Sequence, residues 1–372
     1  MIRPLPRWRS CAFFLLGGFL LILLLKNSDL AMDGVRHGLS LCANTLFPSL
    51  FPFLVLSELL IRWHADEVLG RWFSRPVSAL FGLSPGGATT LLLGALCGFP
   101  VGTTVAVSLV ERGQMSRAEL DRLMLFANNP SSGFLISAVG EALFGNRGAG
   151  VALLLITWLS AACVGVFLRL VCGSVRDTEE AHTAHQSATS SISDFTGSVT
   201  GAFAALLQVF SFVIFFSCVA GCLAPMIEAL SLPRAAGVLL YGLLEMTSGI
   251  SAAVTSLPPA AAFRAAAFFS SFAGLSVCLQ LFSVAQRHTP RLAPYLAARV
   301  AQGALALAFA EIYLRVARPD FVVSESVGTF LTYTGAPTPL VLPLCLALAA
   351  FALCLLLRAT RKKKGAPRAR HI

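Results

Sequence analysis

Polar and helix-breaking residues interrupt three otherwise apolar stretches of this sequence, at 98–102, 128–133 and 245–249. Carboxylate, amide and hydroxyl groups at such positions can hydrogen-bond a small polar solute or a coupling ion. Inside a membrane protein these groups must face a cavity or another helix, because lipid offers them no partner. The predicted substrate-binding residues are therefore Gly98, Pro100, Gly102, Asn128, Asn129, Ser131, Glu245, Thr247, Ser248 and Gly249.

Glu245 is the sharpest candidate among them. An acid at the centre of an apolar segment costs roughly 2.5 to 3.5 kcal/mol on membrane-insertion scales. It can couple transport to a proton or cation, accept a hydrogen bond from substrate, or serve as a structural acid bonded to the neighbouring half-helix. Beside an anionic solute, Glu245 would have to be protonated or neutralised by a cation. Glu58 and Glu311 lie nearer the ends of apolar stretches and are interpreted as structural.

No catalytic residue, cofactor or metal is predicted. Catalysis needs a nucleophile with a base, or a set of metal ligands, and no histidine falls within an apolar segment to act as base. His182 and His185 lie in a polar loop, and a zinc site needs more ligands than this pair. The ten cysteines lie mostly in apolar runs without a CxxC pair, so they are interpreted as small hydrophobic residues.

Composition places these segments in a lipid bilayer. The chain has 372 residues, of which 56% are hydrophobic and 12% charged, and its mean hydropathy is +0.77. Such a chain cannot cover a water-facing surface, which excludes a soluble enzyme, a nucleic-acid module, a coiled coil and a disordered protein. Its length holds roughly eight to ten membrane segments. The net charge of +10 is concentrated in the tail 358–372, which suits anionic lipids.

The expected fold is an all-α polytopic membrane protein with about eight transmembrane helices and two re-entrant hairpins in two inverted repeats. The expected full spans cover 11–25, 38–61, 123–140, 151–172, 200–223, 263–285, 300–316 and 340–357. The first is interpreted as a retained span rather than a signal peptide. Pro48 and Pro52 are expected to bend the second.

The two hairpins are predicted from half-length apolar pieces. The range 76–110 is uncharged and is broken at Pro85-Gly86-Gly87 and again at 98–102, and the range 237–257 is broken at 245–249. Each piece is roughly 12 to 15 Å long as a helix, about half a hydrocarbon core. A single kinked span over 88–110 is the alternative.

Basic residues set the expected topology. Lys and Arg gather in the amino terminus, in the polar stretch 62–75, around 112–122, in a loop 286–299 that includes Arg299, and in the tail. By the positive-inside rule these regions and both termini are cytoplasmic. The expected divisions are 1–37 with the first span, 38–172 as the first repeat with hairpin 88–110, 173–198 as a Ser/Thr-rich linker, 199–290 as the second repeat with hairpin 237–257, 291–357 as C-terminal spans, and 358–372 as a basic tail.

Four motifs carry a resemblance to a known family: LFPSLFPF at Leu46–Phe53, GFPVG at Gly98–Gly102, NNPSSGF at Asn128–Phe134 and GLLEMTSGI at Gly242–Ile250. In this order they resemble the YlbJ family of sporulation integral membrane proteins, within the nucleoside-recognition or "Gate" group, from about Gly38 to Arg287. The resemblance implies a protein of spore-forming bacteria that moves dipicolinic acid from the mother cell across the outer forespore membrane. It also implies kinship with concentrative nucleoside transporters, whose substrates bind between two hairpins and two broken helices.

The sequence therefore favours a transporter of a small polar or anionic solute, with dipicolinate as the expected substrate. Half-helix amino termini would suit its carboxylates. A nucleoside or other small metabolite is the alternative substrate. A membrane scaffold or signalling protein of sporulation is a second alternative, although a scaffold would need no polar clusters at mid-depth. The expected partners are the solute and the bilayer, with no nucleic acid.

Overall fold

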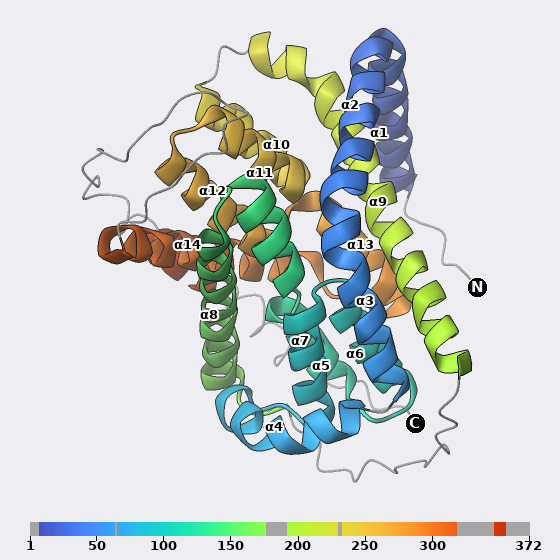
Figure 1. Ribbon diagram of the computed structural model, residues 1–372, viewed down its shortest axis with the longest axis vertical. Helices are drawn as coiled ribbons and strands as arrows, with labels where there is room; N and C mark the ends of the chain where they lie inside the picture. Colours follow the sequence, from blue (N-terminus) through green and yellow to red (C-terminus); the bar gives the residue numbers. More distant parts are fainter. Residues whose placement is uncertain (1–6, 64, 176–191, 230–232, 318–345, 355–372) are drawn as a thin grey trace.

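The computed structural model describes residues 7–63, 65–175, 192–229, 233–317 and 346–354, and the regular structure within these ranges is helical (Figure 1). The all-α class predicted from the sequence is confirmed. The first half contains α1 (Arg7–Lys26), α2 (Ser28–Leu41), the π-helical turn η1 (Cys42–Leu46), α3 (Phe47–Arg62), α4 (Ala65–Phe81), α5 (Pro85–Cys97), α6 (Val101–Glu111), α7 (Arg117–Phe126), the π-helical η2 (Phe134–Leu143) and α8 (Arg147–Cys172). The second half contains α9 (Ile192–Ala229), α10 (Arg234–Leu244), α11 (Met246–Ser256), α12 (Pro259–Phe272), α13 (Gly274–Ala285), the 3-10 turn η3 (Gln286–His288) and α14 (Leu292–Ala317).

Several of these helices are long and apolar enough to cross a membrane. Within the described ranges there are five such helices: Ser28–Leu60, Arg147–Cys172, Ile192–Ile227, Pro259–His288 and Leu292–Ala317. The bent pair Trp72–Phe81 and Pro85–Cys97, with 94° between its arms, adds a sixth if it counts as one broken span. The protein is therefore a polytopic α-helical membrane protein.

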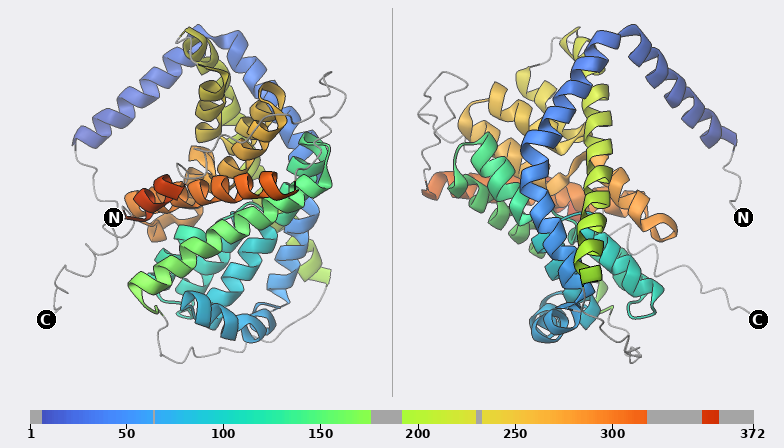
Figure 2. Two further views of the ribbon diagram at one scale, coloured as in Figure 1. Left: turned by 90° about the vertical axis from the view of Figure 1, so that its left-hand side faces the viewer. Right: turned by 45° about the vertical axis from the view of Figure 1, so that its right-hand side comes forward.

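Some expected segments differ from the observed elements. The expected span 123–140 is divided into α7 and η2, with residues 127–133 outside any helix. The expected first span, 11–25, lies within α1, which stands apart from the rest of the protein over most of its length (Figure 2). The expected last span, 340–357, is described only at 346–354, which is helical, and the basic tail lies outside the described residues.

Two regions expected to be non-helical contain helix. Most of the polar stretch 62–75 lies in α4, which crosses the lower end of the structure in Figure 1. The expected linker 173–198 overlaps the start of α9 at Ile192, and its residues 176–191 lie outside the described ranges. Both regions were interpreted as loops because their residues are polar. The short amphipathic helix α4 and the polar first turn of α9 have the composition of loops.

Small residues bring α2 and α9 into close contact. A Cβ atom added at Gly34 would lie 2.8 Å from the Cα of Cys218, and one added at Gly38 would lie 2.9 Å from the Cα of Ile214. Figures 1 and 2 show the continuous rod of α2 and α3 running alongside α9 in the opposite chain direction. Gly-xxx-Gly spacing permits this approach between membrane helices.

Capping side chains fix several of the helix ends that surround the breaks. The Ser84 hydroxyl accepts a hydrogen bond from the Gly87 amide at 3.1 Å and begins α5, which has Pro85 at its first position. The Ser116 hydroxyl likewise accepts from the Glu119 amide at 3.2 Å and begins α7. Such caps satisfy backbone donors that a new helix leaves without partners. The breaks are therefore defined local structures rather than frayed ends.

The helices of the two halves follow the same order. A two-helix hairpin (α5–α6, then α10–α11) precedes an interrupted helix (α7–η2, then α12–α13) and a long helix (α8, then α14). The long helices α8 and α14 have 26 residues each. Two buried apolar clusters fill the interior, and Leu50, Phe99 and Phe210 pack against both of them. The junction between the clusters is where the candidate site lies.

Candidate functional site

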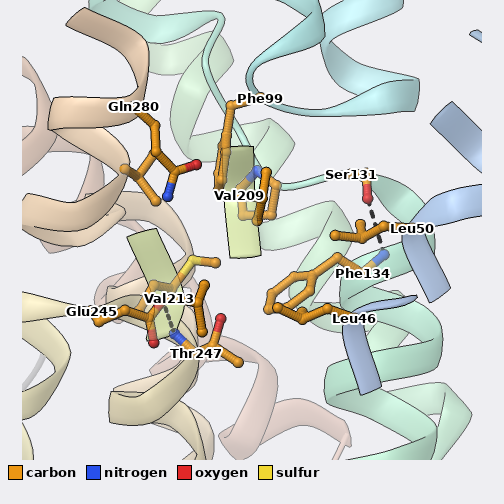
Figure 3. Close-up of a pocket in the computed structure, with 13 residues that line it drawn as sticks. Leu46, Leu50, Phe99, Ser131, Phe134, Val209, Val213, Glu245, Thr247 and Gln280 are labelled. Carbon is orange, nitrogen blue, oxygen red and sulfur yellow. Dashed lines mark hydrogen bonds between the residues drawn. The ribbon is translucent and has the colours of Figure 1, made fainter. Parts of the chain in front are cut away.

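A cavity with about 400 Å³ of empty space lies between the two apolar clusters (Figure 3). Its walls come from both halves of the chain: Leu46, Leu50, Phe99, Pro130, Ser131 and Phe134 from the first, and Val209, Val213, Glu245, Met246, Thr247, Val277 and Gln280 from the second. The lining is mostly apolar with a few polar groups, which is the usual character of a binding site for a small organic molecule.

Glu245 forms the break between α10 and α11. Its backbone is extended (φ −145°, ψ 123°), and its carboxylate accepts hydrogen bonds from the amides of Thr247 at 2.9 Å and Ser248 at 2.5 Å. The side chain is 2% exposed and lies on the cavity wall (Figure 3). Glu245 thus caps the amino terminus of α11, where the helix dipole favours a negative charge. Glu245 therefore serves as a structural helix cap and also lines the cavity.

The break after α5 is joined to the break after α7. The Phe99 amide donates to the Asn129 carbonyl at 3.0 Å, and the Ser132 hydroxyl donates to the Leu96 carbonyl at 3.1 Å. Gly98 has a positive φ of 76°, and a Cβ atom there would collide with the backbone of Ser131. Only glycine tolerates both this backbone conformation and this approach. These contacts place the Phe99 ring and Ser131 on the cavity wall (Figure 3).

Asn128 and Asn129 are buried behind the cavity wall and do not line it. The Asn128 side-chain oxygen accepts from the Thr103 hydroxyl at 2.7 Å, and the Asn129 side-chain oxygen accepts from the Gln302 amide at 2.7 Å. Both asparagine amides also donate to carbonyls of α7, those of Met124 at 3.1 Å and Phe126 at 3.0 Å. In this conformation the two asparagines hold the 127–133 segment against α6 and α14.

Arg299 was expected in a cytoplasmic loop, and that expectation is wrong. It lies inside α14, which begins at Leu292, and is only 1% exposed. Its guanidinium donates to the Asn128 carbonyl at 2.5 Å. The positive-inside rule assigns an arginine from its charge and neighbours alone. It therefore misplaces an arginine that the fold draws into the interior.

Gln280 is a cavity residue that the sequence did not single out. It is 2% exposed; its amide nitrogen donates to the Ser276 hydroxyl at 3.1 Å, and its side-chain oxygen has no hydrogen-bond partner among the described residues. The sequence did contain one sign of a site here, a polar glutamine near the middle of the apolar α13. A buried glutamine points to a functional site less strongly than a buried acid does, because a neutral amide is cheaper to bury. Phe99 and Pro130 were within predicted motifs but were not named as binding residues.

The predicted residues divide into two groups. Ser131, Glu245 and Thr247 line the cavity. The others support the breaks from behind: Ser248 pairs with the Ser217 hydroxyl at 3.1 Å, Gly249 packs on Gly242, Gly102 packs on Gly94, and Pro100, Gly98, Asn128 and Asn129 are buried around the first hairpin. Among the described residues, no group of three or more His, Cys, Asp or Glu side chains is arranged to hold a metal ion.

Comparisons with known proteins identify one informative relative. The chain is 29% identical to the sporulation integral membrane protein YlbJ of Bacillus subtilis (strain 168), over 335 residues that cover 80% of each chain. The resemblance to the YlbJ family drawn from four motifs is thereby confirmed along most of the length. No family model matches the chain. No solved structure matches it either.

Proposed function

Because most of the chain is similar to a sporulation integral membrane protein, we propose that it transports a small polar or anionic solute across a membrane during sporulation. The observation that carries this proposal is the cavity at which Phe99, Pro130, Ser131 and Glu245 meet. These residues come from the break of each hairpin and from the interrupted helix α7–η2. Breaks in membrane helices are tolerated where they line a cavity, and transporters place their sites at such breaks.

The proposed architecture is a pair of inverted repeats, with about eight full spans, two re-entrant hairpins and both termini in the cytoplasm. The shared order of hairpin, interrupted helix and long helix in the two halves supports it. The opposite chain directions of α2–α3 and α9 also support it, since each precedes the hairpin of its half (Figure 1). In this arrangement the hairpins α5–α6 and α10–α11 approach the cavity from opposite sides of the membrane.

The solute that we propose is dipicolinate, exported from the mother cell across the outer forespore membrane. A planar aromatic ring suits a site whose walls carry the rings of Phe99 and Phe134. The amino terminus of α11 lies at the same cavity, and its helix dipole favours a carboxylate of the solute once Glu245, which caps it, is protonated or neutralised by a cation. The proposed role is transport without chemical conversion of the solute.

A neutral solute, such as a nucleoside or another small metabolite, is the second candidate. The residues lining the cavity include no Lys or Arg, and Gln280 offers an unpaired acceptor to a hydroxyl or amine donor. A scaffold or signalling role remains the third candidate. It is favoured only if no solute moves.

Flux through the purified protein in liposomes tests the proposal. Labelled dipicolinate and labelled uridine are offered side by side, and we expect uptake of dipicolinate. Val209→Phe should reduce the flux at least tenfold, because Val209 lines the cavity and the larger ring would fill part of it. Leu207→Phe is the matched control, since Leu207 lies on the same helix with 47% of its surface exposed.

The outcomes separate the candidates. Uptake of uridine alone, blocked by Val209→Phe, supports a transporter but rejects dipicolinate. Absence of flux for both solutes through folded protein rejects the transport function and favours the scaffold. Equal flux through Val209→Phe and Leu207→Phe shows that solute does not pass through this cavity.

A further inference from the structure

Arg299 is a buried positive charge to which no described residue offers a carboxylate. Within the described part of the chain, its only hydrogen bond goes from one terminal nitrogen to the Asn128 carbonyl, and its Nε and second terminal nitrogen have no acceptor. Its electrostatic neighbours are the Tyr295 hydroxyl and the Cys278 thiol. The Tyr295 hydroxyl lies close enough to interact with the guanidinium, but the two groups do not meet the distance and angle of a hydrogen bond.

This arrangement contrasts with that of two buried acids, Glu311 and Glu245. Glu311 is paired with Arg264 at 2.7 Å and with Arg315 at 2.7 Å. Glu245 has two backbone donors on its carboxylate. A buried charge is normally paired because desolvating it alone is expensive. Arg299 therefore calls for an anion that none of the described residues provides.

The position of Arg299 connects it to the cavity. The Asn128 carbonyl that it holds is two residues from Pro130, which lines the cavity, and two extended residues span at most about 7 Å. The guanidinium is thus within roughly 10 Å of the cavity. On the opposite wall, Glu245 contributes a carboxylate that would repel an anion. A fixed positive charge behind the Pro130 wall opposes that repulsion.

We propose that Arg299 is the residue that makes this cavity select anionic solutes, by supplying a buried positive charge behind the wall formed by Pro130 and Ser131. The inference rests on the proposed transport function and names the side chain that determines charge selectivity. Two unit charges 10 Å apart at an effective dielectric constant of about 20 interact strongly enough to change affinity about 15-fold. The attraction acts on carboxylates and leaves neutral solutes of the same shape unaffected.

Equilibrium binding to the purified full-length protein in detergent tests this inference, with dipicolinate and its neutral diamide as the two probes. Wild type should bind dipicolinate more tightly than the diamide. Arg299→Gln should weaken dipicolinate binding about 15-fold and change diamide binding by less than about threefold. Arg299→Lys keeps the charge and should retain the preference for dipicolinate.

Arg122→Gln is the matched control. Arg122 is also buried, and it donates to the backbone carbonyl of Gly173 at 2.6 Å. It does not line the cavity, and Gly173 does not either. Losing this tether should leave both affinities unchanged. If Arg299 were only a tether, Arg299→Gln and Arg299→Lys would weaken both probes equally, which would overturn the proposal.

The proposal is also overturned if wild type prefers the diamide or binds the two probes equally. The transport function is judged separately by flux. Liposomes that take up uridine without any preference for anions would reject anion selection by Arg299 and keep the transporter. Liposomes that move no solute, with protein that still distinguishes dipicolinate from its diamide through Arg299, would reject transport and keep the anion site.

Discussion

Replacing Glu245 separates its role as a helix cap from its role at the cavity. The carboxylate accepts two backbone donors, from Thr247 at 2.9 Å and Ser248 at 2.5 Å. Glu245→Ala leaves both donors buried without an acceptor. Glu245→Gln keeps one acceptor oxygen and so leaves one donor unsatisfied.

The structure gives a graded expectation for stability. A buried donor without an acceptor costs about 1–3 kcal/mol. Glu245→Ala should therefore destabilise the protein by about 2–6 kcal/mol and Glu245→Gln by about 1–3 kcal/mol. Relief from burying an acid acts in the opposite direction, so the test is the order of the variants: wild type most stable, then Gln, then Ala. Transport should be lost in both variants, because neither side chain can take up and release the proton or cation that must neutralise Glu245 when an anion enters the cavity.

Unfolding by sodium dodecyl sulfate in mixed micelles measures the stability order, and solute uptake by liposomes with matched amounts of inserted protein measures transport. Ser116→Ala is the control, because it removes the cap of α7 away from the cavity. It should cost about 1 kcal/mol and leave uptake intact. Wild-type uptake by Glu245→Gln would refute a role in transport. Equal stability of the Gln and Ala variants would refute the capping argument.

Three further predictions concern the packing of α2 on α9, the buried carboxylate of Glu311 and the topology of the first hairpin. Gly34→Leu should drive α2 and α9 apart and lower the yield of folded protein in detergent, whereas Gly18→Leu on α1, where a Cβ meets nothing within 4 Å, should not. Glu311→Gln should destabilise by about 3–5 kcal/mol because it leaves Arg264 and Arg315 without their shared buried carboxylate, whereas Glu141→Gln, at an exposed pair with Arg147, should change stability by less than about 1 kcal/mol in the same unfolding assay. A single cysteine at residue 117 in a cysteine-free variant should resist an impermeant thiol reagent in intact cells, and ready labelling there would contradict a cytoplasmic position and the re-entrant first hairpin.

The positions of the helix breaks could be predicted from the sequence because their causes are local. Gly98 needs a positive φ, Pro130 cannot continue a helix, and Glu245 supplies its own cap to the helix that follows. Each of these properties belongs to a residue and its nearest neighbours. The number of complete spans depended instead on lengths and pairing, and here the sequence placed a whole span at 123–140 where the structure has the shorter α7 and η2.

The side chains that face the cavity could not be predicted in the same way. Asn129 and Ser131 are two residues apart in one motif, yet one binds Gln302 behind the wall and the other lines the cavity. Which direction each takes is fixed by α14, more than 150 residues later, and no local pattern reports it. Gln280 was missed for the same reason, because its importance comes from where α13 packs.

Arg299 shows where the positive-inside rule fails in this chain. Charge near a span end predicts cytoplasm because an exposed arginine is the common case, and burial of an unpaired one is costly. Arg299 lies within two turns of the start of α14 and so satisfies the sequence criterion for a loop arginine. The fold nevertheless buries it against the Asn128 carbonyl with two donor nitrogens left unpaired. Among the described residues no carboxylate offsets the cost of that burial, and an anionic solute in the adjacent cavity is the partner that we propose.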